Sequence, residues 1–98
     1  MTLEQTVKLM QSDNYKDRFI AEYWQTKIRY ERLKNFNNKI EAAKAFNCHN
    51  CDAHMTVPVH DCPDSMLQEQ QHYMGNYLHV LEVRAIIEGI DLGGTYNG

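Results

Sequence analysis

The chain has 98 residues and a formal net charge of −3 at pH 7, which is the size of one domain. A charge this small excludes both a strongly acidic DNA mimic and a strongly basic nucleic-acid binder, so we expect no direct DNA or RNA binding. No segment is apolar over the length that a membrane span requires, and residues 2–11 are too amphipathic for a signal peptide. Cysteines without a secretory signal indicate a reducing cytosol.

Residues 2–11 are expected to form a short helix. Thr2 and Gln5 have the spacing of a capping box, in which each side chain bonds the other residue's backbone. Leu3, Val7 and Met10 form one apolar stripe. A helix this short is marginal alone, so we expect it to dock on the rest of the chain.

A long helix is predicted over residues 15–46, which contain neither proline nor glycine. A second apolar ridge lies about 100° around this helix from its main stripe. One reading is that the short first helix covers the ridge, and the other is that the ridge is a dimer or oligomer interface. The main stripe comprises Phe19, Tyr23, Tyr30, Leu33, Ile40 and Ala43, and the ridge comprises Ile20, Trp24 and Ile28.

Basic residues gather in the middle of this helix, around Tyr30. Lys27, Arg29, Arg32 and Lys34 are interleaved with that aromatic residue, a pattern that is able to hold phosphate groups. The alternative is a solvated helix face with ordinary ion pairs, such as Lys27 with Glu31.

The loop over residues 47–62 contains all three cysteines and three of the five histidines. A Cys-x-x-Cys pair followed by His-x-Cys is typical of a tetrahedral zinc site, and a closed four-ligand shell is structural. The alternatives are a disulfide, which would leave one thiol free, or unliganded reduced thiols. The predicted zinc ligands are Cys48, Cys51, His60 and Cys62, with His54 as the alternative fourth ligand.

A last helix is predicted over residues 63–88. Pro63 and Asp64 suit a helix start, and Gly89 suits its end. Gly75 in the middle weakens the helix, which indicates a close helix contact there. The apolar seam comprises Leu67, Met74, Leu78, Leu81 and Ala85. Residues 89–98 are expected to be a flexible tail.

The predicted fold is therefore all-α, with a short N-terminal helix and two long antiparallel helices whose connecting loop is stapled by a structural zinc ion. No convincing catalytic set is present. Gly93-Gly94 is not followed by a helix, and the Glu69-x-x-His72 pair of a di-iron bundle occurs only once. We therefore expect a protein that is not an enzyme.

Both long helices resemble a family of small phage and prophage proteins, the sponges that counter CBASS immunity. The resemblance rests on the segments YKDRFIAEY (residues 15–23), YERLKNF (30–36), LQEQQ (67–71), MGNYL (74–78), LEVR (81–84) and EGI (88–90). It implies a helical hairpin with a short leading helix, assembled into a homo-oligomer. It also implies that cyclic oligonucleotide signals are sequestered between protomers without being cleaved.

The resemblance also implies a set of ligand contacts. An aromatic residue at the start of the second helix matches Tyr15, and a basic residue further along matches Lys27, Arg29 or Arg32. Tyr30 and Arg84 complete the expected contacts. The implied ligand is a cyclic di- or trinucleotide, and the implied location is the cytoplasm of the infected bacterial host.

Two alternatives belong to other classes of protein. One is a protein-binding inhibitor, such as an anti-CRISPR that blocks a CRISPR effector nuclease, for which Tyr, Trp and Arg are the usual interface anchors. The other is a phage structural or regulatory module in which the metal serves only as a scaffold.

Overall fold

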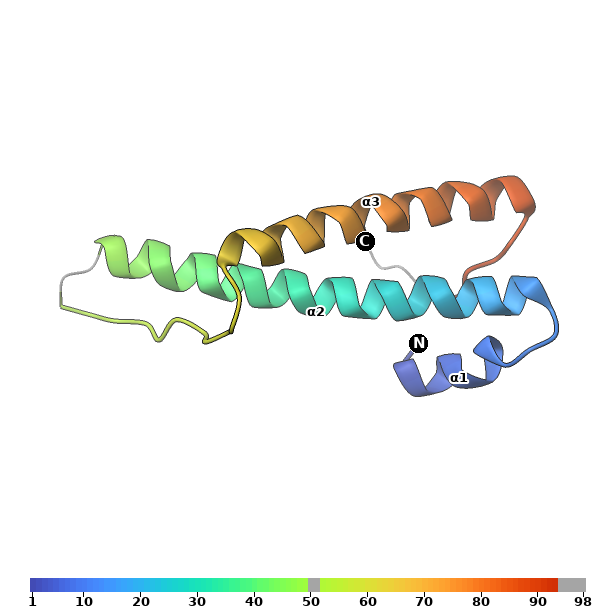
Figure 1. Cartoon of the computed structure of the whole chain (residues 1–98), viewed down its shortest axis with the longest axis horizontal. Helices are drawn as coiled ribbons and strands as arrows, with labels where there is room; N and C mark the ends of the chain where they lie inside the picture. Colours follow the sequence, from blue (N-terminus) through green and yellow to red (C-terminus); the bar gives the residue numbers. More distant parts are fainter. Residues whose placement is uncertain (50–51, 94–98) are drawn as a thin grey trace.

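In the residues that the structure describes, the regular structure consists of three helices, α1 (Leu3–Met10), α2 (Tyr15–His49) and α3 (Asp64–Glu88). The computed structural model describes residues 1–49 and 52–93. In Figure 1, α3 runs back along α2 in the antiparallel direction, and α1 lies beside the N-terminal half of α2. The molecule is elongated, with extents of 57 × 26 × 25 Å. All regular structure in the described residues is helical, which confirms the all-α prediction.

The N-terminal helix begins with the predicted capping box. Thr2 Oγ1 accepts a 3.2 Å hydrogen bond from the Gln5 amide, and Gln5 Oε1 accepts one of 2.9 Å from the Thr2 amide. The helix docks through Thr6, which is fully buried and accepts a 3.0 Å bond from Gln25 Nε2. Of the predicted apolar stripe, Val7 and Met10 remain 42% and 47% exposed, although Met10 Sδ accepts a 3.5 Å hydrogen bond from Gln25 Nε2 of α2.

The main core lies between α2 and α3, toward the end where α2 begins. Leu81 is 1% exposed and the Tyr23 and Trp24 rings pack edge to face, with centroids 5.4 Å apart. This edge-to-face geometry adds to the gain from burial itself. The cluster comprises Phe19, Tyr23, Trp24, Leu78, Leu81, Ala85 and Ile90. Most of the predicted main stripe is therefore buried, with Ile40 and Ala43 continuing it toward the other end.

The chain that follows α3 packs against part of the second ridge, at Ile20 and Trp24. Gly89 ends the helix in the left-handed conformation at φ 67°, and the Ile90 amide bonds the Ala85 carbonyl at 2.8 Å. The chain then turns back onto α2, where Ile90 is buried and Leu92 packs against the core. Trp24 is therefore covered in part by this segment of its own chain, which neither of the two expected readings included. Residues 89–98 were expected to be a flexible tail, but Ile90 and Leu92 in this segment are in contact with the helices.

The connection between α2 and α3 begins later than predicted. The helix α2 continues three residues past residue 46 and ends at His49, so Cys48 lies in its last turn. Asn47 then fixes the loop, because its amide group donates to the Met55 carbonyl at 2.9 Å and accepts from the Met55 amide at 2.7 Å. The loop thus folds back along the end of α2.

Candidate ligand groove between the long helices

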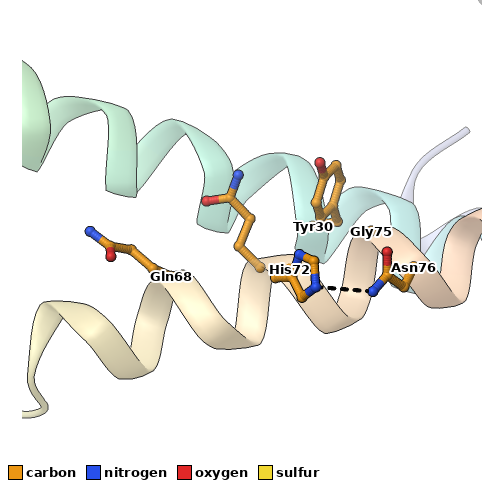
Figure 2. Close-up of a pocket in the computed structure, with 6 residues that line it drawn as sticks. Tyr30, Gln68, His72, Gly75 and Asn76 are labelled. Carbon is orange, nitrogen blue, oxygen red and sulfur yellow. Dashed lines mark hydrogen bonds between the residues drawn. The ribbon is translucent and has the colours of Figure 1, made fainter.

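An open groove of about 520 Å³ lies between the middle parts of α2 and α3 (Figure 2). Small-molecule sites commonly have volumes of about 300–1,000 Å³. None of its lining residues is acidic, so no carboxylate in the lining would repel an anionic ligand. The lining comprises Tyr30 from α2 and Gln68, Gln71, His72, Gly75 and Asn76 from α3.

The position of Tyr30 depends on Gly75. A β-carbon built on Gly75 would lie 3.4 Å from Tyr30 Cε2, so the ring rests against the backbone of α3. This contact matches the close helix approach expected from a glycine in mid-helix. The ammonium group of Lys27 lies 5.7 Å from the Tyr30 ring centroid. The groove thus contains an aromatic ring held in place beside a positive charge.

Amide side chains supply most of the polar groups in the groove. Asn37 Nδ2 donates to Gln71 Oε1 at 2.8 Å and to the Leu67 carbonyl at 3.2 Å, which orients Gln71. Asn76 Nδ2 lies 3.2 Å from His72 Nε2, as Figure 2 shows. An amide carries a donor and an acceptor side by side, so it is able to pair with the edge of a nucleobase.

A second cluster lies at the end of the hairpin where α2 begins and α3 ends. Tyr15 donates a 3.3 Å hydrogen bond to Glu88, and Arg84 Nε donates one of 2.8 Å to the same carboxylate. The Arg84 guanidinium also lies 4.8 Å from the Phe19 ring centroid. The hydrogen bond from Arg84 lowers the pKa of Glu88. Arg84 is therefore engaged by a carboxylate and a ring within its own chain.

The structure divides the predicted contact residues into two sites. Lys27 and Tyr30 lie together in the middle of the hairpin, whereas Tyr15 and Arg84 meet at its end. The 15 residues from Tyr15 to Tyr30 span roughly 22 Å of helix. Arg29 and Arg32 are exposed, and neither lines the groove. Lys27 forms the expected ion pair with Glu31, at 3.1 Å.

Sequence reasoning missed the polar groove residues of α3, Gln68, Gln71, His72 and Asn76. A signal for them was present, because polar residues flank the mid-helix Gly75 on both sides. Amide residues on a helix are ordinarily read as solvated. Only the position of Tyr30 across from Gly75 shows that they share a groove.

The predicted zinc ligands are placed only in part. Cys51 lies outside the described residues, while Cys48 and Cys62 are exposed free thiols. Across residues 1–49 and 52–93, no three or more His, Cys, Asp or Glu side chains gather as a metal site. His60 nevertheless has a feature that suits a ligand. Its Nε2 lies 2.6 Å from Asp64 Oδ1, and its Nδ1 is buried without a hydrogen-bond partner.

A histidine that binds a metal commonly pairs its other ring nitrogen with a carboxylate. The His60–Asp64 pair has this form, and Lys44 also binds Asp64. His60 Nδ1 is therefore positioned to act as a zinc ligand. A complete site would also need the exposed cysteines to approach this atom. That approach requires the loop to rearrange from the conformation described here.

No helix in the part of the chain that the structure describes combines the length and hydropathy needed to cross a membrane. No curated protein and no solved structure matches the chain. The model of the Sequestin family matches residues 13–87, which include α2, the loop and nearly all of α3, and with them the groove. Because this match spans most of the sequence, the chain belongs to the Sequestin family.

Proposed function

We propose that this protein is a phage-encoded anti-defence protein, an oligomeric sponge that binds cyclic oligonucleotide immune signals of the CBASS type and withholds them without cleavage. The name of the Sequestin family is compatible with a sequestering function. The observation that carries the proposal is the groove in which Tyr30 lies among amide side chains beside Lys27.

Each part of the groove suits one part of a nucleotide. The Tyr30 ring offers a stacking surface for a base, an interaction of about 1–3 kcal/mol in single-stranded nucleic-acid binding. The amides of Gln68 and Asn76 offer donors and acceptors to base edges. Lys27, which pairs with Glu31 at 3.1 Å, would supply positive charge for a phosphate in competition with that carboxylate. This set of groups binds a nucleotide and contains no activated nucleophile, which favours capture over turnover.

The cluster at Tyr15 is a weaker candidate for the first binding site. Arg84 already pairs with Glu88, and Tyr15 bonds the same carboxylate. An anionic ligand there would have to compete with Glu88 for the guanidinium group. We assign the main ligand contacts to the groove because it offers a hollow with a stacking ring and amide groups, and we assign a supporting role to the hairpin end.

Calorimetric titration with a panel of cyclic di- and trinucleotides tests this function. We expect tight binding of at least one of them, and recovery of the intact ligand after the protein is denatured. A cleaved product would contradict a sponge. Absence of binding across the whole panel would contradict a cyclic oligonucleotide ligand and favour a protein partner, such as a CRISPR effector nuclease.

A matched pair of substitutions tests the location of the site. Gln68→Glu adds one negative charge inside the groove, and Asn35→Asp adds the same charge at an exposed position of α2 that does not line it. We expect Gln68→Glu to weaken binding about tenfold, from roughly 1–2 kcal/mol of repulsion, and Asn35→Asp to have little effect. Equal effects would place the ligand elsewhere.

We also propose that zinc binds the loop as a structural ion, with Cys48, Cys51, Cys62 and His60 as ligands. The support is the His60–Asp64 pair and the unpartnered His60 Nδ1. Bound zinc would hold the loop against the start of α3, and the proposed ligand groove does not depend on it.

A further inference from the structure

The ligand groove contains one side chain that is able to become positively charged, that of His72. Of the described residues that line the groove, His72 is the one that ionises to a cation, and none of them is a carboxylate. Gln68, His72 and Asn76 are spaced four residues apart, so their side chains lie along one face of α3 (Figure 2). Because Tyr30 lines the same groove, a nucleotide that stacks on Tyr30 would lie beside the imidazole ring.

The fixed positive charge beside the groove is compensated within the chain. The ammonium group of Lys27 lies 3.1 Å from a carboxylate oxygen of Glu31, and the Lys27 side chain is only 13% exposed. A phosphate group in the groove would therefore meet Lys27 in competition with Glu31, whereas the lining itself offers His72. The other basic residues of this stretch of α2 are exposed and do not line the groove; these are Arg29, Arg32 and Lys34.

The contact between His72 and Asn76 suits both charge states of the ring. In the structure Asn76 Nδ2 lies 3.2 Å from His72 Nε2. An amide nitrogen is a donor, so this arrangement needs Nε2 as an acceptor, which occurs only in the neutral ring. A half-turn of the amide presents Asn76 Oδ1 instead, and this oxygen accepts from Nε2–H of the protonated ring. Protonation therefore leaves neither group without a partner.

The carboxylates at neighbouring positions do not line the groove. Glu69, one turn before His72 on α3, lines a separate and largely apolar groove of about 410 Å³. In the described residues α2 is the helix that packs on α3, and there Glu31 forms the ion pair given above. The other titratable neighbours are phenols, Tyr30 on α2 and Tyr73 on α3, whose ring centroid lies 5.7 Å from that of His72. A protonated His72 would thus gain its opposite charge from the ligand.

We propose that His72 is the phosphate-binding residue of the groove and that the protein takes up a proton when it captures its ligand. The inference rests on the proposed function, since it requires an anionic nucleotide in the groove. The proton comes from the solvent and binds Nε2, which then donates to Asn76 Oδ1. The Nδ1–H group donates to a phosphate oxygen. No bond of the nucleotide is broken, in keeping with capture without cleavage.

The affinity for the ligand should follow the charge of the ring. Histidine is the side chain that ordinarily changes its charge between about pH 5 and pH 8, whereas a phosphodiester stays negatively charged throughout this range. The protonated ring attracts the phosphate and the neutral ring does not. Binding should therefore be tighter at the acidic end of the range and weaken as the pH rises.

Calorimetric titration with a panel of cyclic di- and trinucleotides of adenosine, guanosine and uridine tests the proposal. Titration in two buffers of different ionisation enthalpy, such as Tris and PIPES, gives the number of protons taken up. We expect net proton uptake, and a roughly tenfold loss of affinity between about pH 5.5 and about pH 8. Binding with equal affinity at both pH values and no proton uptake would overturn this inference alone. Absence of binding across the panel at both pH values would overturn the proposed function as well.

Three substitutions separate His72 from the other histidines. His72→Gln cannot be protonated, so it should bind weakly at both pH values without proton uptake. His72→Lys carries a permanent charge and should bind tightly at both. Because His72 is exposed, these variants should fold as the parent chain does. His79→Gln, at an exposed position of α3 outside the groove, is the control and should keep the pH dependence of the parent chain. If His72→Gln also keeps it, the proton binds elsewhere and the proposal is wrong.

Discussion

The indole Nε1 of Trp24 donates a 2.6 Å hydrogen bond to the carbonyl oxygen of Leu92. This bond joins α2 to the chain beyond the end of α3, across 68 positions of sequence. Ile90 is buried beside it, and Ile20 packs against the same cluster. The segment that follows α3 therefore completes the core at Trp24, on the ridge for which the sequence left two other candidate covers, α1 and a second copy.

Trp24→Phe should lower stability, because it removes the donor and leaves the Leu92 carbonyl unpaired. We expect a loss of about 1–3 kcal/mol in the free energy of unfolding, or roughly 4–8 °C in melting temperature for each kcal/mol. Thermal unfolding followed by circular dichroism measures the change.

Two shortened chains serve as the control for this bond. A chain that ends at Gly93 retains the Leu92 carbonyl, whereas one that ends at Asp91 loses it. The chain that ends at Asp91 should melt at a lower temperature than the one that ends at Gly93, because it loses both this carbonyl and the Leu92 side chain that packs against the core. Because Trp24 lies in the core of one chain, the Phe variant should keep its mass in solution. A melting temperature equal to that of the parent chain would show that the bond contributes nothing.

Gly75→Ala should raise the stability of the fold and impair the ligand groove. Alanine is favoured over glycine inside a helix by about 1 kcal/mol. The added β-carbon would meet Tyr30 Cε2 at 3.4 Å, the border of ordinary contact, and a small shift of the ring end would relieve it. Thermal unfolding should show a rise of several degrees, while titration with the bound nucleotide should show weaker binding. A drop in melting temperature would mean that Tyr30 cannot move.

Lowering the pH should remove the stabilising effect of Glu88. Its hydrogen bonds from Arg84 and Tyr15 lower its pKa from the ordinary value near 4.5. A carboxylate with a lowered folded pKa stabilises the fold above its unfolded value and loses this effect as the pH falls through the folded value. The melting temperatures of the parent chain and Glu88→Gln should thus differ above about pH 4.5 and converge in stronger acid.

The Glu88 titration also has a direct check. Carbon NMR of the side-chain carboxyl should give a pKa below the ordinary value in the parent chain. In Arg84→Gln, which removes the largest cause of the shift, that pKa should move up again. An ordinary Glu88 pKa in the parent chain would contradict the Arg84 contact.

Zinc should raise the melting temperature of the chain, because metal bound only by the folded protein adds its binding free energy to folding. In small zinc modules this free energy is on the order of 10 kcal/mol. Replacing both Cys48 and Cys51 with serine should abolish the rise and the metal content measured by mass spectrometry. His79→Asn, at an exposed histidine on α3, is the control.

The fourth zinc ligand is decided by a second comparison. His60→Asn should weaken zinc binding if Nδ1 is the ligand atom, whereas His54→Asn should not. The opposite result would assign the site to His54. If the cysteine double variant melts at the same temperature as the parent chain in the presence of zinc, the proposal of a zinc staple is wrong.

Sequence alone determined the helical elements and most of what they bury. Local chemistry, which acts over a few residues, predicts where the helices begin and end. It accounts for the starts at Tyr15 and near Asp64, the end at Gly89 and the capping box at Thr2. Helix periodicity found Phe19 and Leu81 because an apolar stripe must be buried whatever covers it. Gly75 was also informative. Glycine destabilises the interior of a helix, so its presence there predicts a close contact, which the structure shows to be with Tyr30.

Only the tertiary structure decided which surface covers which. Periodicity identified the ridge at Trp24 but not the segment at Leu92 that lies against it, because a loop that packs has no repeat to recognise. The separation of Tyr15 from Tyr30, and the meeting of Tyr30 with the amides of α3, depend on how two helices are aligned. That alignment is fixed by contacts between residues far apart in the chain, which a local pattern does not contain.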